Sequence, residues 1–138
     1  MRRFRWPYIV ATAVYCAGIF ALSSSPDLPD AVPSWASFPQ RDKVAHLIIY
    51  AGLAALVYLG LVRSDSSADR RARWLGPVVF STVYGLTDEV HQIFVPHRTF
   101  DLLDLLADGA GATIMVAALE YRRRSRRRDG GTSSLPGR

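Results

Sequence analysis

The fold depends on residues 84–92, which read Tyr-Gly-Leu-Thr-Asp-Glu-Val-His-Gln, and on the longer stretch of residues 74–121 that contains them. Two carboxylates, a histidine and a glutamine occur here within sequence that otherwise resembles a membrane span. Ionisable groups are costly inside a membrane, so they indicate a functional site by default. After a turn at residues 96–98, Asp101, Asp104 and Asp108 are spaced for one face of a second helix. We therefore predict a polar site where two helix ends meet.

The rest of the sequence is apolar in blocks. The 138-residue chain is 49% hydrophobic with a mean hydropathy of +0.09, and most of its charges lie in the termini and loops. Four blocks of about 17 to 21 residues hold most of the apolar side chains, and each is about long enough to cross a ~30 Å hydrocarbon core. No strand pattern or internal repeat is present. The sequence predicts an all-α, four-helix transmembrane bundle.

Charged and turn-forming residues bound the predicted helices. These helices cover residues 6–22, 44–62, 74–94 and, starting at 101 or 102, up to 121. Asp42 is a candidate N-cap of the second helix, and Pro77 fits the first turn of the third. Four prolines predict a loop over residues 23–40. We expect residues 1–121 to form the membrane domain and residues 122–138 to form a basic, disordered cytoplasmic tail.

Basic residues predict the orientation of the bundle. Four spans place the N-terminus, the loop at residues 63–73 and the C-terminal tail on one side, and these segments hold all of the 17 Lys and Arg except Arg41, Lys43 and Arg98. By the positive-inside rule, both termini of this multi-pass cell-membrane protein are cytoplasmic.

The tail would contact anionic lipid headgroups. We predict no nucleic-acid partner, because no aromatic residues interleave with its arginines. A signal peptide would share the charged start, but three further apolar blocks favour an uncleaved first helix.

Three of the predicted helices place polar side chains at a similar depth. One stripe of the second helix carries Asp42, His46 and Tyr50. The third helix has two neighbouring stripes: the first carries Tyr84, Asp88 and His91, and the second carries Gly85, Glu89 and Gln92. One face of the fourth helix carries Asp101, Asp104, Asp108 and Gly111. Such groups cannot face lipid, so they should point into the bundle. Crowded carboxylates in a low dielectric suit general acid or base chemistry.

Two other interpretations of these residues remain open. In the first, the polar groups form a satisfied structural network, with Lys43 and Arg98 neutralising carboxylates and with Asp42 and Asp101 capping helices. In the second they bind a metal. The nitrogen and oxygen ligands would then come from His46, Glu89, His91 and Asp108. Their spacing matches no zinc motif, so we predict no metal and no cofactor. His97, in the turn, is expected to be solvated.

Three motifs occur in order along the chain. They are Asp42-Lys43-x-x-His46-x-x-x-Tyr50, Asp88-Glu89-x-x-Gln92-x-Phe94-x-Pro96-x-Arg98 and Asp104-x-x-x-Asp108-x-x-Gly111-Ala112. Over about residues 6–120 the chain resembles the VanZ-like family of bacterial integral membrane proteins. Asp108 stands where many members have Asn. The family is named for a protein associated with low-level resistance to teicoplanin-type glycopeptides, so the resemblance implies a role with cell-wall precursors or envelope lipids.

These observations lead to three hypotheses about function. The first is an outer-leaflet site that binds a lipid-linked or peptidoglycan-type ligand. Its ligand-binding residues would be Asp42, Lys43, Asp88, Gln92, Arg98, Asp104 and Asp108. The second is a hydrolase or transferase with Glu89 as general base or acid and His46 as its proton partner. The third is a structural or proton-relay bundle. The expected partners are membrane lipids, a lipid-linked cell-wall precursor and a second copy of the chain, because four helices leave little interior for a large headgroup. The ligand, any reaction and any antibiotic resistance stay open.

Overall fold

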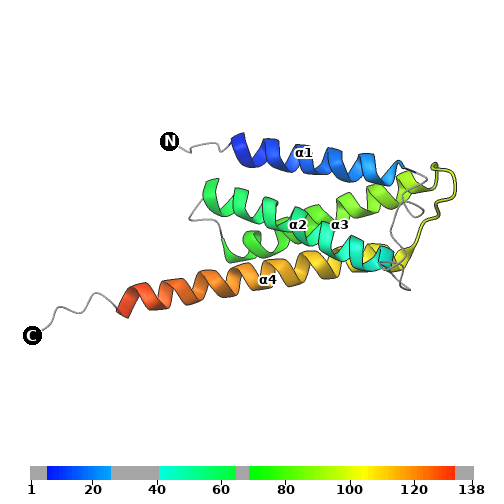
Figure 1. The fold of residues 1–138 in the computed structure, drawn as a ribbon. Helices are drawn as coiled ribbons and strands as arrows, with labels where there is room; N and C mark the ends of the chain where they lie inside the picture. The colour runs from blue at the N-terminus through cyan, green and yellow to red at the C-terminus, as the bar shows by residue number, and fades with distance from the viewer. Residues whose placement is uncertain (1–5, 26–40, 65–68, 133–138) are drawn as a thin grey trace, which may run out of the picture.

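The computed structural model describes residues 6–25, 41–64 and 69–132 of the chain. These residues form four helices, α1 (Trp6–Ser23), α2 (Arg41–Ser64), α3 (Arg70–Gln92) and α4 (Leu102–Thr132). Figure 1 shows the four helices side by side, with the first residues of α1 and the last turns of α4 at the same end of the molecule. The all-α prediction is confirmed for this part of the chain.

Three of the described helices, α1, α2 and α4, are long and apolar enough to cross a membrane. Large apolar side chains are exposed along all three, among them Val14, Ile48 and Leu106. In a water-soluble protein such extensive apolar exposure would be a liability, whereas in a bilayer these side chains contact lipid. The protein is therefore a multi-pass membrane protein.

Helix α3 is apolar outside and polar inside. Its buried residues include Ser81, Asp88, Glu89 and Gln92, and its exposed ones include Leu75, Val79, Phe80, Val83, Leu86 and Val90. A helix on the surface of a water-soluble protein has the opposite arrangement. The buried polar residues lower the average hydropathy of α3. This explains why α3, unlike the other three helices, is not apolar enough by composition alone to be identified as a membrane span.

The starts of α2 and α3 differ from the prediction. Helix α2 begins at Arg41, so Asp42 lies in its first turn and is not the N-cap. A carboxylate in the first turn still interacts favourably with the helix dipole. Helix α3 begins at Arg70, so Pro77 lies inside the helix rather than in its first turn. The predicted loop over residues 23–40 falls mostly outside the described residues.

The end of α4 also differs from the prediction. The helix continues to Thr132 instead of ending at residue 121. Arginine has a high helix propensity, and extending an existing helix costs far less than starting one. Residues 122–132 of the tail are therefore helical, and Figure 1 shows this part of α4 extending beyond the other helices. Residues 133–138 lie outside the described part of the chain, so the division into a domain and a tail stays a prediction.

Glycine brings α2 and α4 together beside the polar residues. A Cβ atom on Gly111 would lie 2.9 Å from the carbonyl carbon and 3.1 Å from the Cα of Leu47 on α2. Small residues allow this close approach between membrane helices. Farther along the same helices, Ala54 and Tyr58 pack against Ala112 and Val116. The contact at Gly111 sets how near the polar side chains of the two helices come to one another.

Candidate functional site

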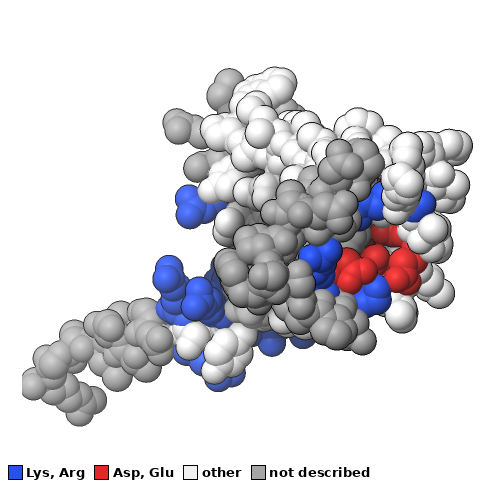
Figure 2. Space-filling model, turned by 45° about the vertical axis from the view of Figure 1, so that its right-hand side comes forward, with Lys and Arg blue, Asp and Glu red and all other residues white. Residues whose placement is uncertain are grey.

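The candidate residues gather at one end of the bundle, where α2 and α4 begin and α3 ends. We define the polar cluster as Asp42, Lys43, His46, Asp88, Glu89, Gln92, Asp101, Asp104 and Asp108. This end lies opposite the last turns of α4 (Figure 1). Figure 2 shows acidic side chains gathered at this end, with many of the basic side chains at the other. The structure thus brings together residues that the sequence spreads over three segments.

Lys43 joins α2 to the start of α4. Its Nζ atom lies 2.7 Å from Asp101 Oδ2, 3.1 Å from Asp104 Oδ1 and 3.3 Å from Asp42 Oδ2. Asp101 also caps α4, as predicted, because its Oδ1 accepts a 2.8 Å hydrogen bond from the Leu103 amide. The hydrogen bonds from Lys43 and Leu103 hold the pKa of Asp101 below its usual value. The charge of Lys43 is therefore shared among three carboxylates.

A second pair connects the same two helices deeper in the bundle. His46 Nδ1 lies 2.9 Å from Oδ1 of Asp108, whose side chain is completely buried. An ionised carboxylate can only accept hydrogen bonds, so with Asp108 ionised the ring proton lies on Nδ1 and Nε2 is the nitrogen that can meet a ligand. Gly85 on α3 leaves the space that Asp108 Oδ2 occupies. That oxygen is buried without a hydrogen-bond partner among the described residues.

Glu89 on α3 completes the buried part of the cluster. It is fully buried, and its Oε2 accepts a 2.8 Å hydrogen bond from the backbone amide of Asp101. Gln92 Nε2 lies 3.4 Å from Glu89 Oε1 and 3.4 Å from Asp88 Oδ2. Ligand atoms of His46, Glu89 and Asp104 all lie within 4.8 Å of one another. Each of α2, α3 and α4 therefore contributes one potential ligand to a single point.

Two candidate side chains contact α1 and the residues that follow it. Arg98 Nη2 lies 3.5 Å from the carbonyl oxygen of Ser25, and His91 Nε2 lies 2.9 Å from Ser24 Oγ. The His91 ring also packs on Phe20, with ring centroids 4.5 Å apart. If the polar groups formed a structural network, Arg98 was expected to neutralise a carboxylate. Among the described residues, it instead contacts the Ser25 carbonyl. His97 is exposed, as expected, and has a positive φ of 63°.

Sequence reasoning missed a second buried polar group at the other end of the bundle. Glu120 on α4 accepts a 2.9 Å hydrogen bond from the Tyr58 hydroxyl and a 2.8 Å hydrogen bond from Arg73 Nε. These contacts tie α2, α3 and α4 together. The available signal was a lone acid between the apolar part of α4 and its arginines.

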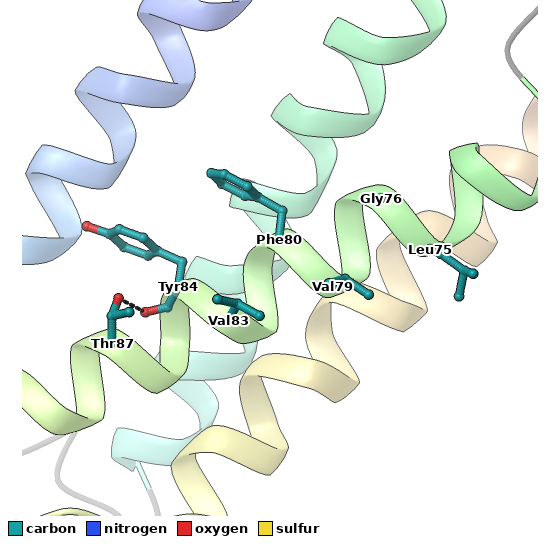
Figure 3. Close-up of a pocket in the computed structure, with 7 residues that line it drawn as sticks. All are labelled: Leu75, Gly76, Val79, Phe80, Val83, Tyr84 and Thr87. Carbon is teal, nitrogen blue, oxygen red and sulfur yellow. Dashed lines mark hydrogen bonds between the residues drawn. The ribbon is translucent and has the colours of Figure 1, made fainter.

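An apolar groove along α3 lies apart from the candidate residues. Figure 3 shows its lining of Leu75, Gly76, Val79, Phe80, Val83, Tyr84 and Thr87. The Thr87 hydroxyl donates a 2.7 Å hydrogen bond to the Tyr84 carbonyl of its own helix, so it is already satisfied (Figure 3). The groove contains no residue of the polar cluster, and its largely apolar lining suits a surface in contact with lipid.

Comparison with known proteins agrees with the motifs. The model of the VanZ/LLP1 family matches residues 9–122. A protein of Schizosaccharomyces pombe, named uncharacterized protein C11E3.10, is 33% identical over 88 residues, which are 62% of this chain and 52% of that protein. The chain therefore spans about half the length of this relative. No solved structure matches the chain. Since the family model covers most of the sequence and includes all the motif residues, the chain belongs to the VanZ/LLP1 family.

Proposed function

We propose that the protein binds the polar headgroup of an envelope lipid or of a lipid-linked cell-wall precursor in the polar cluster. The observation that carries this proposal is the change in exposure across the cluster. At its rim, the side chains of Asp42 and Asp101 are 51% and 36% exposed, whereas Asp108 at its base is completely buried. Such a graded set of polar groups, at one end of a bundle with an apolar exterior, suits a ligand with a polar head and apolar chains.

The proposed site faces the outside of the cell, with both termini in the cytoplasm. This orientation requires α3 to cross the membrane as well. Its 23 residues make a helix about 34 Å long at about 1.5 Å per residue. Its apolar exterior supports a crossing, and so does the position of the start of α1 and the end of α4 at one end of the bundle (Figure 1). The basic residues at that end favour the cytoplasmic side.

The cluster favours a ligand that donates hydrogen bonds. Lys43 is already engaged by three carboxylates, and the other charged groups at the base of the cluster are carboxylates as well, of which Asp108 Oδ2 has no hydrogen-bond partner among the described residues. Hydroxyl and ammonium groups, which occur in sugar and amine headgroups, match such acceptors. The link between the VanZ-like family and teicoplanin-type resistance is consistent with an envelope ligand.

The test is mass spectrometry of lipids and cell-wall precursors that co-purify with the full chain in detergent. Wild-type protein is compared with Lys43→Gln at the rim, Gln92→Leu near the base and Glu120→Gln as a buried control at the other end. We expect one lipid class to be enriched on wild type and on Glu120→Gln and to be lost from the two cluster variants. The same lipids on all four folded proteins would refute the proposal.

A membrane-embedded hydrolase or transferase is the second candidate function. The observation that favours it is the His46–Asp108 pair, in which a buried carboxylate orients the imidazole beside Glu89. This arrangement suits a general base. With Glu89→Gln, we expect the co-purifying species to accumulate in its unreacted form. If Glu89→Gln instead lowers only the folded yield, the residue has the structural or proton-relay role.

A further inference from the structure

We propose that His46, Glu89 and Asp104 bind a divalent transition-metal ion, of which Zn²⁺ is the best match. The three residues come from α2, α3 and α4, and one ligand atom of each lies within 4.8 Å of the other two. Ligands of a tetrahedral ion at about 2.0–2.2 Å lie about 3.5 Å apart, so small side-chain rotations would bring these atoms around one ion. This inference goes beyond the proposed lipid ligand and does not depend on it.

The chemistry of the three ligands favours zinc over magnesium or calcium. One imidazole and two carboxylates form a mixed nitrogen and oxygen set, which suits Zn²⁺ and related metals, whereas Mg²⁺ and Ca²⁺ prefer oxygen alone. Glu89 is completely buried and Asp104 is 7% exposed, so the ion would be held inside the bundle. Three protein ligands leave a fourth position open, as in catalytic zinc sites.

The contact between His46 and Asp108 is an independent reason to expect a metal. Metal-binding histidines usually donate their second ring N–H to a carboxylate, which fixes the ring and makes the other nitrogen a better ligand. Asp108 Oδ1 lies 2.9 Å from His46 Nδ1 and thus leaves Nε2 for an ion. The other oxygen of Asp108 is buried without a hydrogen-bond partner in the described part of the chain. A fully buried carboxylate with an unpaired oxygen is costly in free energy, and a positive charge nearby would lower that cost.

The balance of charge in the cluster supports the same conclusion. Lys43 divides its charge among Asp42, Asp101 and Asp104, while Glu89 and Asp108 are completely buried acids. Buried charges in proteins are usually paired or bind metals. A divalent ion would neutralise two carboxylates at once. Protons would neutralise them as well, so the experiment must separate a metal from a proton.

A second group of acids at the rim is a poorer site. Asp42, Asp101 and Asp104 also bring ligand atoms within 4.8 Å of one another. Asp104 belongs to both groups and contacts Lys43 in either case, so the groups differ in their other members: Asp42 and Asp101 also contact Lys43 and Asp42 is exposed, whereas Glu89 is completely buried. The group has no histidine. The sequence spacing matched no zinc motif because the ligands of the buried site come from three different helices.

The experiment measures metal bound to the full-length protein in detergent. The protein is stripped with a chelator, incubated with Zn²⁺ alone and freed of excess ion, and bound metal is counted by plasma mass spectrometry. We expect about one Zn²⁺ per chain, as one three-ligand site requires. Both His46→Gln and Glu89→Gln should lose it, and Asp108→Asn should weaken binding by about 10- to 100-fold. Glu120→Gln, which alters a buried acid elsewhere, should retain it.

Three results would overturn the proposal. They are no bound Zn²⁺ on folded wild-type protein, equal loss of Zn²⁺ from Glu120→Gln, and loss from Asp42→Asn together with retention in His46→Gln. The last result would assign the ion to the exposed acids. Lipid co-purification from the chelated wild-type protein keeps the two proposals separate. Lipid that stays bound while Zn²⁺ is absent supports the headgroup site without a metal, and Zn²⁺ binding without any lipid supports the metal alone.

Discussion

Replacing Gly111 with alanine should push α2 and α4 apart at the polar cluster. The new methyl group would lie 2.9 Å from the carbonyl carbon of Leu47, a backbone atom that cannot rotate away. Carbon atoms pack at about 3.5–4.0 Å, so the two helices must separate by about 1 Å. Gly109 provides a matched control on the same helix. A methyl group there would lie 3.5 Å from Thr82 Oγ1, which is an ordinary contact.

The expected cost follows from the contacts beside Gly111. The distance between His46 Nδ1 and Asp108 Oδ1 is 2.9 Å. An increase of about 1 Å moves it beyond the range of about 2.7–3.2 Å for such hydrogen bonds. Losing a hydrogen bond to a charged group costs about 1.5–3 kcal/mol. Alanine also stabilises a helix by up to about 1 kcal/mol relative to glycine, and this gain is common to both variants. Gly111→Ala should therefore be about 1.5–3 kcal/mol less stable than Gly109→Ala.

The assay is unfolding in mixed detergent and SDS micelles, followed by the helical circular dichroism of purified protein. The free energies of unfolding of Gly111→Ala and Gly109→Ala are compared directly, so the shared change in helix propensity cancels. We expect Gly109→Ala to match or exceed wild type and Gly111→Ala to fall below it. Equal stability of the two variants would show that α2 and α4 do not approach each other at Gly111 and that this contact does not set the distances in the polar cluster.

Three further predictions concern other parts of the molecule. Glu120→Leu should destabilise the fold by about 3–5 kcal/mol in the same unfolding assay, because Arg73 and Tyr58 lose both the negative charge and the hydrogen-bond acceptor. Glu120→Gln also removes the charge but keeps a carbonyl oxygen that can accept, so it should cost less. Equal losses of stability in the two variants would contradict this. His97→Gly should stabilise the protein by up to about 1 kcal/mol, because glycine adopts a positive φ without the clash of a Cβ, and a loss of stability would argue against the left-handed turn. The pKa of Asp101 is lower in the folded protein than in the unfolded chain, because Lys43 donates a hydrogen bond to its carboxylate. The ionised Asp101 therefore stabilises the fold fully above the ordinary aspartate pKa of about 3.9. This stabilisation is lost as the pH falls through the lower pKa of the folded state. Unfolding measured against pH should thus show a weaker loss of stability in acid for Asp101→Asn than for wild type, and identical curves would exclude this linkage.

Local sequence patterns predicted most of the helices well. Helix α1 covers Trp6–Ser23, one residue longer than predicted, and α4 starts at Leu102 as predicted. Both boundaries follow from an apolar run that begins or ends beside turn-forming or charged residues. The predicted end of α4 at residue 121 is wrong, because a basic tail of low hydrophobicity is typical of disorder, whereas arginine is also a good helix former. Composition alone does not separate these two outcomes.

The candidate residues of the site were also predictable, but most of their partners were not. Helical spacing placed His46, Glu89 and Asp104 on inward faces, and all three lie in the polar cluster. The same spacing did not indicate that His46 would pair with Asp108, or that Arg98 would contact the Ser25 carbonyl. Which groups meet depends on how far one helix is shifted along another, and no single helix carries that information.

The sequence by itself determined that this protein is a helical membrane protein of the VanZ/LLP1 family with polar residues at one end of its helices. Hydropathy and periodicity are properties of one segment at a time, so they can be read without the fold. Only the tertiary structure decided which charges are shared, which acids are buried and where side chains from three helices converge. The close contact of Gly111 with Leu47 sets the position of α2 against α4, and the resulting distances between helices decide the chemistry of the site.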